Sequence, residues 1–258
     1  QAVDEGKTPV LAVGLSAIHK AHLAAALGLD TGRPVLVLTD DDNAANRFAA
    51  DLRGFSERDV VQLPSRELVM ADVVGVSRGY EQRRLAALDE LTEAHFAVAS
   101  VQAAAQRTMP PEALKAAIVS LATGETAPLD ELAQSLTRAG YERCVQVEGT
   151  GQFSIRGGIL DVFPPQAEHP YRVEFWDDEI DSISTFDVGS QRRLEQCECL
   201  RCLPCMESIP ALAKGGAAGL AKAVLALTST RRKKQHADLQ TNLERDAERL
   251  RETGSLPA

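Results

Sequence analysis

The segment at residues 147–187 reads VEGTGQFSIRGGILDVFPPQAEHPYRVEFWDDEIDSISTFD, and it decides the fold of the second half of the chain. Runs rich in aromatic and β-branched residues flank Gly157-Gly158 and, further on, Asp177-Asp178. Glycine and acidic pairs between such runs are typical of hairpin turns. We therefore predict antiparallel strands at residues 152–156, 159–163, 171–176 and 180–186.

Side chains along a strand point alternately to opposite faces, which separates the residues of YRVEFW at 171–176. Its first, third and fifth residues are apolar and predict the buried face, whereas Arg172, Glu174 and Trp176 fall on the other face. Trp and Arg are enriched among residues that dominate protein interfaces. A tryptophan at the end of a strand can also fold over the edge of a core, and both interpretations stay open from the residues alone.

The same rule applies to QFSIR at residues 152–156. It predicts that Phe153 and Ile155 are buried and that Ser154 and Arg156 point outward. A helix expected at residues 130–140, with Leu132 and Leu136 at helical spacing, would cover the apolar face of this sheet. We therefore expect two arginines and a tryptophan on one open sheet surface.

Composition restricts the class of protein. The chain has 258 residues and a formal net charge of −9, which argues against a protein whose whole surface grips nucleic acid. It contains no apolar run long enough to span a membrane. We predict a cytoplasmic protein without membrane contact. Aromatic residues gather between Tyr141 and Phe186, which indicates a separate β-rich module.

The first hundred residues alternate short apolar runs with helical patterns. Apolar runs at residues 9–13, 34–39, 60–64 and 96–101 are predicted strands. This alternation is typical of a parallel sheet covered by helices on both faces, the layout of nucleotide-binding α/β folds. After the second run, Asp41 and its acidic neighbours are predicted to cap a helix.

The segment after the first apolar run is where such folds bind phosphate. Gly14 and Lys20 fit the phosphate-loop pattern, but His19 stands in place of its second glycine and Ala21 in place of the hydroxyl that holds magnesium. We therefore interpret Gly14, His19, Lys20 and Ala21 as a degenerate loop. We predict no nucleotide cofactor and no catalytic residue.

Four cysteines lie within nine positions: Cys197, Cys199, Cys202 and Cys205. Structural zinc sites usually pair two Cys-x-x-Cys knuckles across a longer separation. We predict no metal site here and interpret these residues as strand cysteines of a reducing compartment, with zinc or iron as the open alternative.

The motifs together resemble a known family. GYERCVQVEGTGQFSIRGGILDVFPP at residues 140–165 and PYRVEFWDDEIDSISTFDVGSQRRL at 170–194, with LPSRE at 63–67 and SRGYEQRRLAALDEL at 77–91, are similar to the amino-terminal, UvrB-like region of the bacterial transcription-repair coupling factors, the Mfd family. The resemblance extends over nearly the whole chain.

The resemblance implies an α/β fold made of a degenerate helicase-like parallel-sheet domain and an inserted antiparallel β-rich α+β domain. The implied boundaries are 1–117 for the first domain, 118–203 for the inserted domain, and 204–258 for a helical return segment that we expect to be truncated.

The resemblance also implies a partner, the damage-recognition protein UvrA. The two family arginines that contact UvrA correspond to Arg156 and Arg172, and the family aromatic to Trp176, where phenylalanine is more usual. The implied function is a non-catalytic adaptor of transcription-coupled nucleotide excision repair. In the family, RNA polymerase and duplex DNA are bound by domains that this chain lacks.

Two alternatives remain at this point. A residual phosphate-loop ATPase would depend on Lys20. A UvrB-like DNA-damage-binding protein would need an aromatic-rich hairpin, and between Leu63 and Phe96 the only aromatic residue is Tyr80. One ring is too few for a stacking clamp on DNA.

Overall fold

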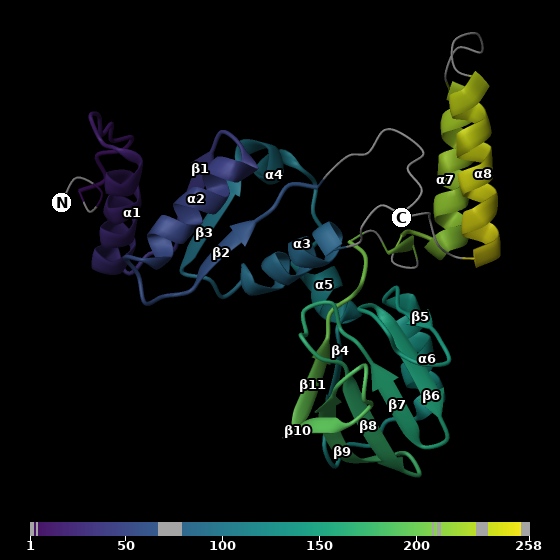
Figure 1. Ribbon diagram of the computed structural model, residues 1–258. Coiled ribbons are helices and arrows are strands. Elements are labelled where there is room, and N and C mark those ends of the chain that lie inside the picture. Colours follow the sequence, from purple (N-terminus) through teal and green to yellow (C-terminus); the bar gives the residue numbers. More distant parts are fainter. Residues whose placement is uncertain are drawn as a thin grey trace. The chain divides into compact units, whose positions relative to one another are not determined.

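The computed structural model describes residues 3, 5–66, 79–207, 209–210, 213–230 and 237–253. Contacts divide the chain into two units, one formed by residues 1–70 and 83–111 and the other by 71–82 and 112–258 (Figure 1). The domain boundaries drawn from the sequence stay predictions. The segment at 67–78, which includes Glu67 of the LPSRE motif and Ser77 and Arg78 of the SRGYEQRRLAALDEL motif, lies outside the described residues.

The first unit contains alternating helices and strands. They are α1 (Ala17–Thr31), β1 (Val35–Thr39), α2 (Asp42–Arg53), β2 (Val60–Leu63), most of α3 (Gly79–Glu90), β3 (Phe96–Ser100) and α4 (Val101–Ala105). The three strands form a parallel sheet in the order β1-β3-β2. As predicted, Asp41 caps α2, with its carboxylate accepting a hydrogen bond from the backbone N–H of Ala44 at 2.7 Å.

One face of this sheet is covered by α1 and α2. Ala25 of α1 and Ala45, Ala49 and Leu52 of α2 pack against Phe96 and other strand residues in one buried cluster. The opposite face is open along β1, where Leu36 and Leu38 are 62% and 53% exposed. The prediction that helices cover both faces is therefore wrong for β1.

The predicted strand at residues 9–13 is also wrong, because the structure has no strand there. Leu11 and Val13 are 87% and 78% exposed. An apolar run becomes a strand only where a neighbouring strand offers backbone hydrogen bonds, and periodicity cannot reveal that neighbour. The chain instead reaches Ser16, which caps α1.

The second unit contains the antiparallel sheet predicted from residues 147–187. Its strands are β5 (Glu142–Arg143), β6 (Gln152–Arg156), β7 (Ile159–Val162), β8 (Tyr171–Trp176), β9 (Glu179–Phe186) and β10 (Arg193–Cys197), in the spatial order β10-β9-β8-β7-β6-β5. Only the short β5–β6 pair is parallel. A separate two-stranded ribbon pairs β4 (Val119–Ala122) with β11 (Cys199–Cys202).

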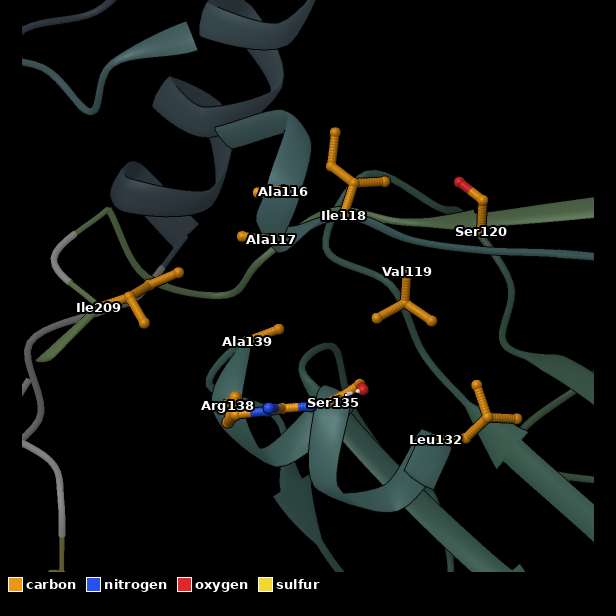
Figure 2. A pocket seen from close by; sticks show the side chains of 10 residues that line it. All are labelled: Ala116, Ala117, Ile118, Val119, Ser120, Leu132, Ser135, Arg138, Ala139 and Ile209. Atoms are coloured by element: carbon orange, nitrogen blue, oxygen red, sulfur yellow. Dashed lines mark hydrogen bonds between the residues drawn. The ribbon is translucent and has the colours of Figure 1, made fainter. Parts of the chain in front are cut away.

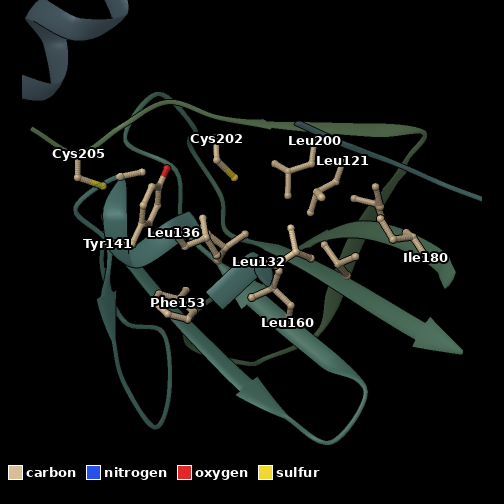
Figure 3. Close-up of a cluster of buried hydrophobic side chains, with 14 residues drawn as sticks. Leu121, Leu132, Leu136, Tyr141, Phe153, Leu160, Ile180, Leu200, Cys202 and Cys205 are labelled. Atoms are coloured by element: carbon tan, nitrogen blue, oxygen red, sulfur yellow. The ribbon is translucent and has the colours of Figure 1, made fainter. Parts of the chain in front are cut away.

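Helix α6 (Leu129–Arg138) covers the apolar face of this sheet (Figure 3). Its Leu132 and Leu136 pack against Phe153, Leu160 and other strand residues, with the β4–β11 ribbon closing the same core. The helix ends before Gly140, whose φ of +91° favours glycine. The predicted covering helix is confirmed.

The remaining described helices are α5 (Pro111–Ala117), α7 (Gly216–Thr230) and α8 (Ala237–Thr253). α7 and α8 pack together through Ala221, Ala247 and Leu250. No helix among the described residues is long and apolar enough to cross a membrane. The mixed α/β class, with one parallel and one antiparallel sheet, is as predicted.

Candidate functional site

The candidate site lies on the sheet face opposite α6. Strand pairing aligns Ser154 of β6 with Asp161 of β7, Asp161 with Arg172 of β8, and Arg172 with Ser184 of β9. Their chain neighbours face the core, among them Leu160 and Val173, which are fully buried. Strand alternation therefore places a polar row on the other face, as the sequence predicted for Arg172.

Asp161 is the centre of this row. Its side chain is 2% exposed, and both of its oxygens accept hydrogen bonds from arginines. Oδ1 lies 2.7 Å from Nε of Arg172, and Oδ2 lies 2.9 Å from Nη2 of the same side chain and 2.7 Å from Nη2 of Arg156. One carboxylate thus joins the two predicted arginines, one of them through a bidentate pair.

Arg172 is held on several sides. Its guanidinium lies 4.5 Å from the ring centre of Phe186, and Nη2 also donates to Oε1 of Gln191 at 3.2 Å. Hydrogen bonding to Asp161 raises the pKa of Arg172 above its ordinary value. The side chain is only 19% exposed. The expectation that Arg172 stands on an open surface is therefore only partly correct.

Arg156 differs, because 48% of its side chain is exposed. It is the last residue of β6 and precedes Gly157, whose φ of +60° allows the tight turn into β7. A Cβ atom on Gly158 would lie 3.0 Å from the carbonyl oxygen of Phe175. The two glycines therefore let β7 start close to β8 while Arg156 stays at the surface.

Ser154 corrects one expectation, since it is 1% exposed instead of pointing into solvent. Its hydroxyl donates to the carbonyl oxygen of Val145 at 2.9 Å. A residue on the polar face of a strand is exposed only where nothing lies over it, and here the Val145 backbone lies close by. Alternation predicts the face but not its covering.

Trp176 is 80% exposed and ends β8, four residues beyond Arg172 on the same strand. Asp177, with φ of +56°, begins the turn into β9. The preceding Phe175 packs against the core, so alternation directs Trp176 to the polar face. The alternative that this ring folds over a core edge is wrong.

Glu174 lies between Arg172 and Trp176 on β8. It accepts hydrogen bonds from Oγ of Ser182 at 2.9 Å and from Nη2 of Arg193 at 2.8 Å, and these lower its pKa. Sequence reasoning missed Asp161 and Arg193. The signal for Asp161 was present, because a charged residue between Leu160 and Val162 must lie on the face opposite to theirs.

The residues of the predicted degenerate loop lie just before α1 and in its first turns. Gly14 has φ of +77°, but α1 begins only three residues later, and His19, Lys20 and Ala21 all lie in its first turns. Nδ1 of His19 lies 3.0 Å from the hydroxyl of Ser16, Lys20 is exposed, and Ala21 is fully buried.

The four clustered cysteines lie on β10, on β11 and directly after it, and all are free thiols. Cys202 and Cys205 are buried on either side of Tyr141, whose hydroxyl donates to the carbonyl of Leu203 at 2.6 Å (Figure 3). Burial raises the pKa of Cys202 to about 12. No group of three potential metal ligands comes together in the described part of the chain.

A cavity of about 500 Å³ lies between α6 and the residues that join α5 to β4 (Figure 2). Its lining is mainly apolar, and Arg138, which donates to the hydroxyl of Ser135 at 3.1 Å, is its one charged residue. The cavity lies on the α6 side of the sheet. It is therefore separate from the arginines and Trp176.

Comparison with known proteins shows which family the domain carrying this polar face matches. Residues 119–207, which contain the whole polar face, match the UvrB interaction domain family. The chain is similar to the transcription-repair-coupling factors of Bacillus subtilis, at 34% identity over 96% of this chain and 22% of the relative, and of Mycobacterium tuberculosis, at 36% over 71% and 16%. The factor of Escherichia coli is 32% identical over 72% of this chain and 16% of its own length.

The resemblance predicted from the sequence is therefore confirmed. The chain is similar to the amino-terminal, UvrB-like region of transcription-repair-coupling factors, and it spans between 16% and 22% of the length of these relatives.

Proposed function

We propose that this chain is the adaptor part of a transcription-repair coupling factor and that it recruits UvrA through the sheet face carrying Arg156, Arg172 and Trp176. Support comes from the match of residues 119–207 to the UvrB interaction domain family. It also comes from the exposure of Trp176 and Arg156 on one face of that domain.

The observation that carries the proposal is that Trp176, with 80% of its surface open to solvent, ends the strand that also carries Arg172. Burial of such a ring against a partner removes a large apolar surface from water and so stabilises the complex. An arginine on the same face can donate directional hydrogen bonds to acidic groups of the partner. Aromatic and arginine anchors of this kind dominate the energetics of protein interfaces.

The direct test measures binding of the purified chain to UvrA encoded in the same genome by isothermal titration calorimetry. Arg156→Ala is expected to weaken binding by about 2 kcal/mol or more, the scale of an interface hot spot. Arg138→Ala is the matched control, because Arg138 is an exposed arginine of the same unit on the covered side of the sheet. Equal affinity of wild type and Arg156→Ala would refute the proposal.

We further propose that the chain is not an enzyme and that its first part, residues 1–117, is a degenerate helicase-like domain. The presence of His19 in place of the second glycine, and of Ala21 in place of the magnesium-binding hydroxyl, supports this. Saturable, magnesium-dependent ATP binding that Lys20→Ala abolishes would contradict it.

The domain plan of the proposal places the UvrA-binding domain at residues 118–203 and a return segment at 204–258. A cytoplasmic location belongs to the same proposal. RNA polymerase and duplex DNA, as partners of a complete coupling factor, would be contacted outside these 258 residues. Limited proteolysis that cuts within 118–203 before it cuts near either boundary would contradict the domain plan.

A further inference from the structure

We propose that Asp161 is a positioning residue. It fixes Arg156 as the cation that meets a carboxylate of the partner, while the mostly enclosed Arg172 is its second ion-pair partner within the domain. This inference rests on the proposed function. It assigns different roles to two arginines that the family resemblance treats alike, and it adds a residue that the resemblance did not supply.

The first step is the geometry of the carboxylate. The two carboxylate oxygens of Asp161 accept three hydrogen bonds, of 2.7 to 2.9 Å, from Arg156 and Arg172. The side chain is 2% exposed, so Asp161 itself is not available to a partner. Charge-assisted bonds of this length restrict the orientation of both guanidinium groups.

The second step is the difference between the arginines. Nε and Nη2 of Arg172 donate to Asp161, its Cζ lies over the Phe186 ring, and Oε1 of Gln191 accepts from Nη2. Arg156 donates to Asp161 only through Nη2, and in the part of the chain that the structure describes its Nε and Nη1 make no hydrogen bond. Arg156 therefore keeps two donor nitrogens, Nε and Nη1, for a partner, whereas the Arg172 guanidinium makes most of its contacts within the domain.

The third step is charge. Within these ion pairs, two arginines share one carboxylate, which leaves the Arg156–Asp161–Arg172 group with a charge of +1, and the Arg193–Glu174 pair adds none. Because Arg156 is the exposed member of the cluster, the uncompensated charge is accessible there. A carboxylate is the group that such a cation accepts with directional hydrogen bonds, which makes an acidic side chain of the partner the expected ligand.

A double-mutant cycle of Arg156→Ala and Asp161→Asn, read out as the Kd for UvrA, tests the coupling. Each single substitution is expected to raise Kd about tenfold or more, equivalent to about 1.4 kcal/mol. In the Arg156→Ala background, Asp161→Asn is expected to add less than about twofold, because the side chain that it positions is already gone. Equal effects in both backgrounds would overturn the inference while leaving the proposed function intact.

A second readout does not use UvrA. In the wild type, nuclear magnetic resonance of the arginine Nε–Hε groups is expected to show hindered rotation of the Arg156 guanidinium, and in Asp161→Asn rapid rotation. Free rotation of Arg156 in the wild type would also overturn the inference. Wild-type affinity of Arg156→Ala would instead refute the proposed function and, with it, this inference.

Two further variants separate positioning from folding. Asp161→Asn leaves the charge of Arg172 uncompensated, which could unfold the domain. The double variant Asp161→Asn/Arg172→Gln removes both charges, so it keeps the test valid if the single variant unfolds. It is expected to fold and to bind as weakly as Arg156→Ala, and wild-type affinity would contradict the inference. Asp181→Asn is the matched control, since it removes the same charge from an exposed position on β9, and its Kd is expected to stay within about twofold of the wild type.

Discussion

Trp176→Ala is expected to abolish most UvrA binding without destabilising the fold. The ring is 80% exposed in the free chain, so removing it takes little from the domain core. Surface substitutions of this kind usually change the free energy of unfolding by less than about 0.5 kcal/mol. The thermal midpoint of the variant should therefore remain close to that of the wild type.

The size of the binding loss follows from the area of the ring. A tryptophan buries about 150–250 Å² in an interface, and with 80% of the ring exposed in the free chain roughly 120–200 Å² remains to be covered. At about 25 cal/mol per Å² this gives roughly 3–5 kcal/mol. Ordering the side chain costs about 0.5–1.5 kcal/mol, which leaves about 2–4 kcal/mol. Since 1.4 kcal/mol is a factor of ten, Kd should rise roughly 30- to 700-fold.

The assay benefits from Trp176 being the single tryptophan of the chain. Labelling with 5-fluorotryptophan gives one ¹⁹F resonance, which reports on this side chain alone even when UvrA is present unlabelled. Addition of UvrA is expected to shift and broaden this resonance, and calorimetry gives the Kd of the wild type and of Trp176→Ala.

Two controls limit the interpretation. Trp176→Phe keeps an aromatic ring with a smaller area and should lose less affinity than Trp176→Ala. Leu11→Ala removes a side chain that is 87% exposed in the other unit and should leave Kd unchanged. If Trp176→Ala binds UvrA with the wild-type Kd, or if the ¹⁹F resonance stays unchanged in the complex, the assignment of this face to UvrA is refuted.

Three further predictions concern the free protein. Arg172→Ala should lower the free energy of unfolding by about 2–4 kcal/mol in urea titrations, because it leaves the nearly buried Asp161 carboxylate with Arg156 as its one arginine partner, and an unchanged midpoint would contradict the described ion pair. Hydrogen bonds from Ser182 and Arg193 lower the pKa of Glu174 in the folded protein. These bonds therefore stabilise the fold fully at pH values above the ordinary carboxyl pKa, and this stabilisation is lost as the pH falls through the lowered pKa of Glu174. The wild type should therefore lose more stability on acidification than Glu174→Gln, and parallel pH profiles would contradict this. Iodoacetamide should modify the exposed Cys199 in the native protein, but modify Cys202, whose pKa burial raises to about 12, only after unfolding; mass spectrometry of native and urea-treated protein distinguishes the two cases.

Strand alternation predicted the second unit well. It assigned Phe153 and Val173 to the core and Arg156, Arg172 and Trp176 to the opposite face, because a period of two leaves no choice once the hairpin turns are recognised. It did not predict that Ser154 is covered or that Arg172 is mostly enclosed. Those outcomes depend on the segment at Val145 and on Gln191, which reach the sheet from loops without periodicity.

The first unit was predicted less completely. Helix and strand patterns gave the order of its described elements from α1 onward, but the apolar run at residues 9–13 is not a strand and Leu36 and Leu38 are exposed. Both errors have one cause, since apolar periodicity indicates that a segment prefers burial without indicating what buries it. Whether Arg156, Arg172 and Trp176 bind UvrA stays a prediction.

The buried Asp161 has a consequence for how substitutions in this domain will be classified. In a library of variants sorted first for folded protein and then for UvrA binding, changes at Asp161 and Arg172 would be depleted in the first sort, because a half-removed buried ion pair is costly to the fold. Changes at Trp176 would pass the first sort and be lost only in the second. A surface that recruits a partner would thus be divided between positions constrained by folding and a position constrained by recognition alone, although Arg172 and Trp176 lie on the same strand.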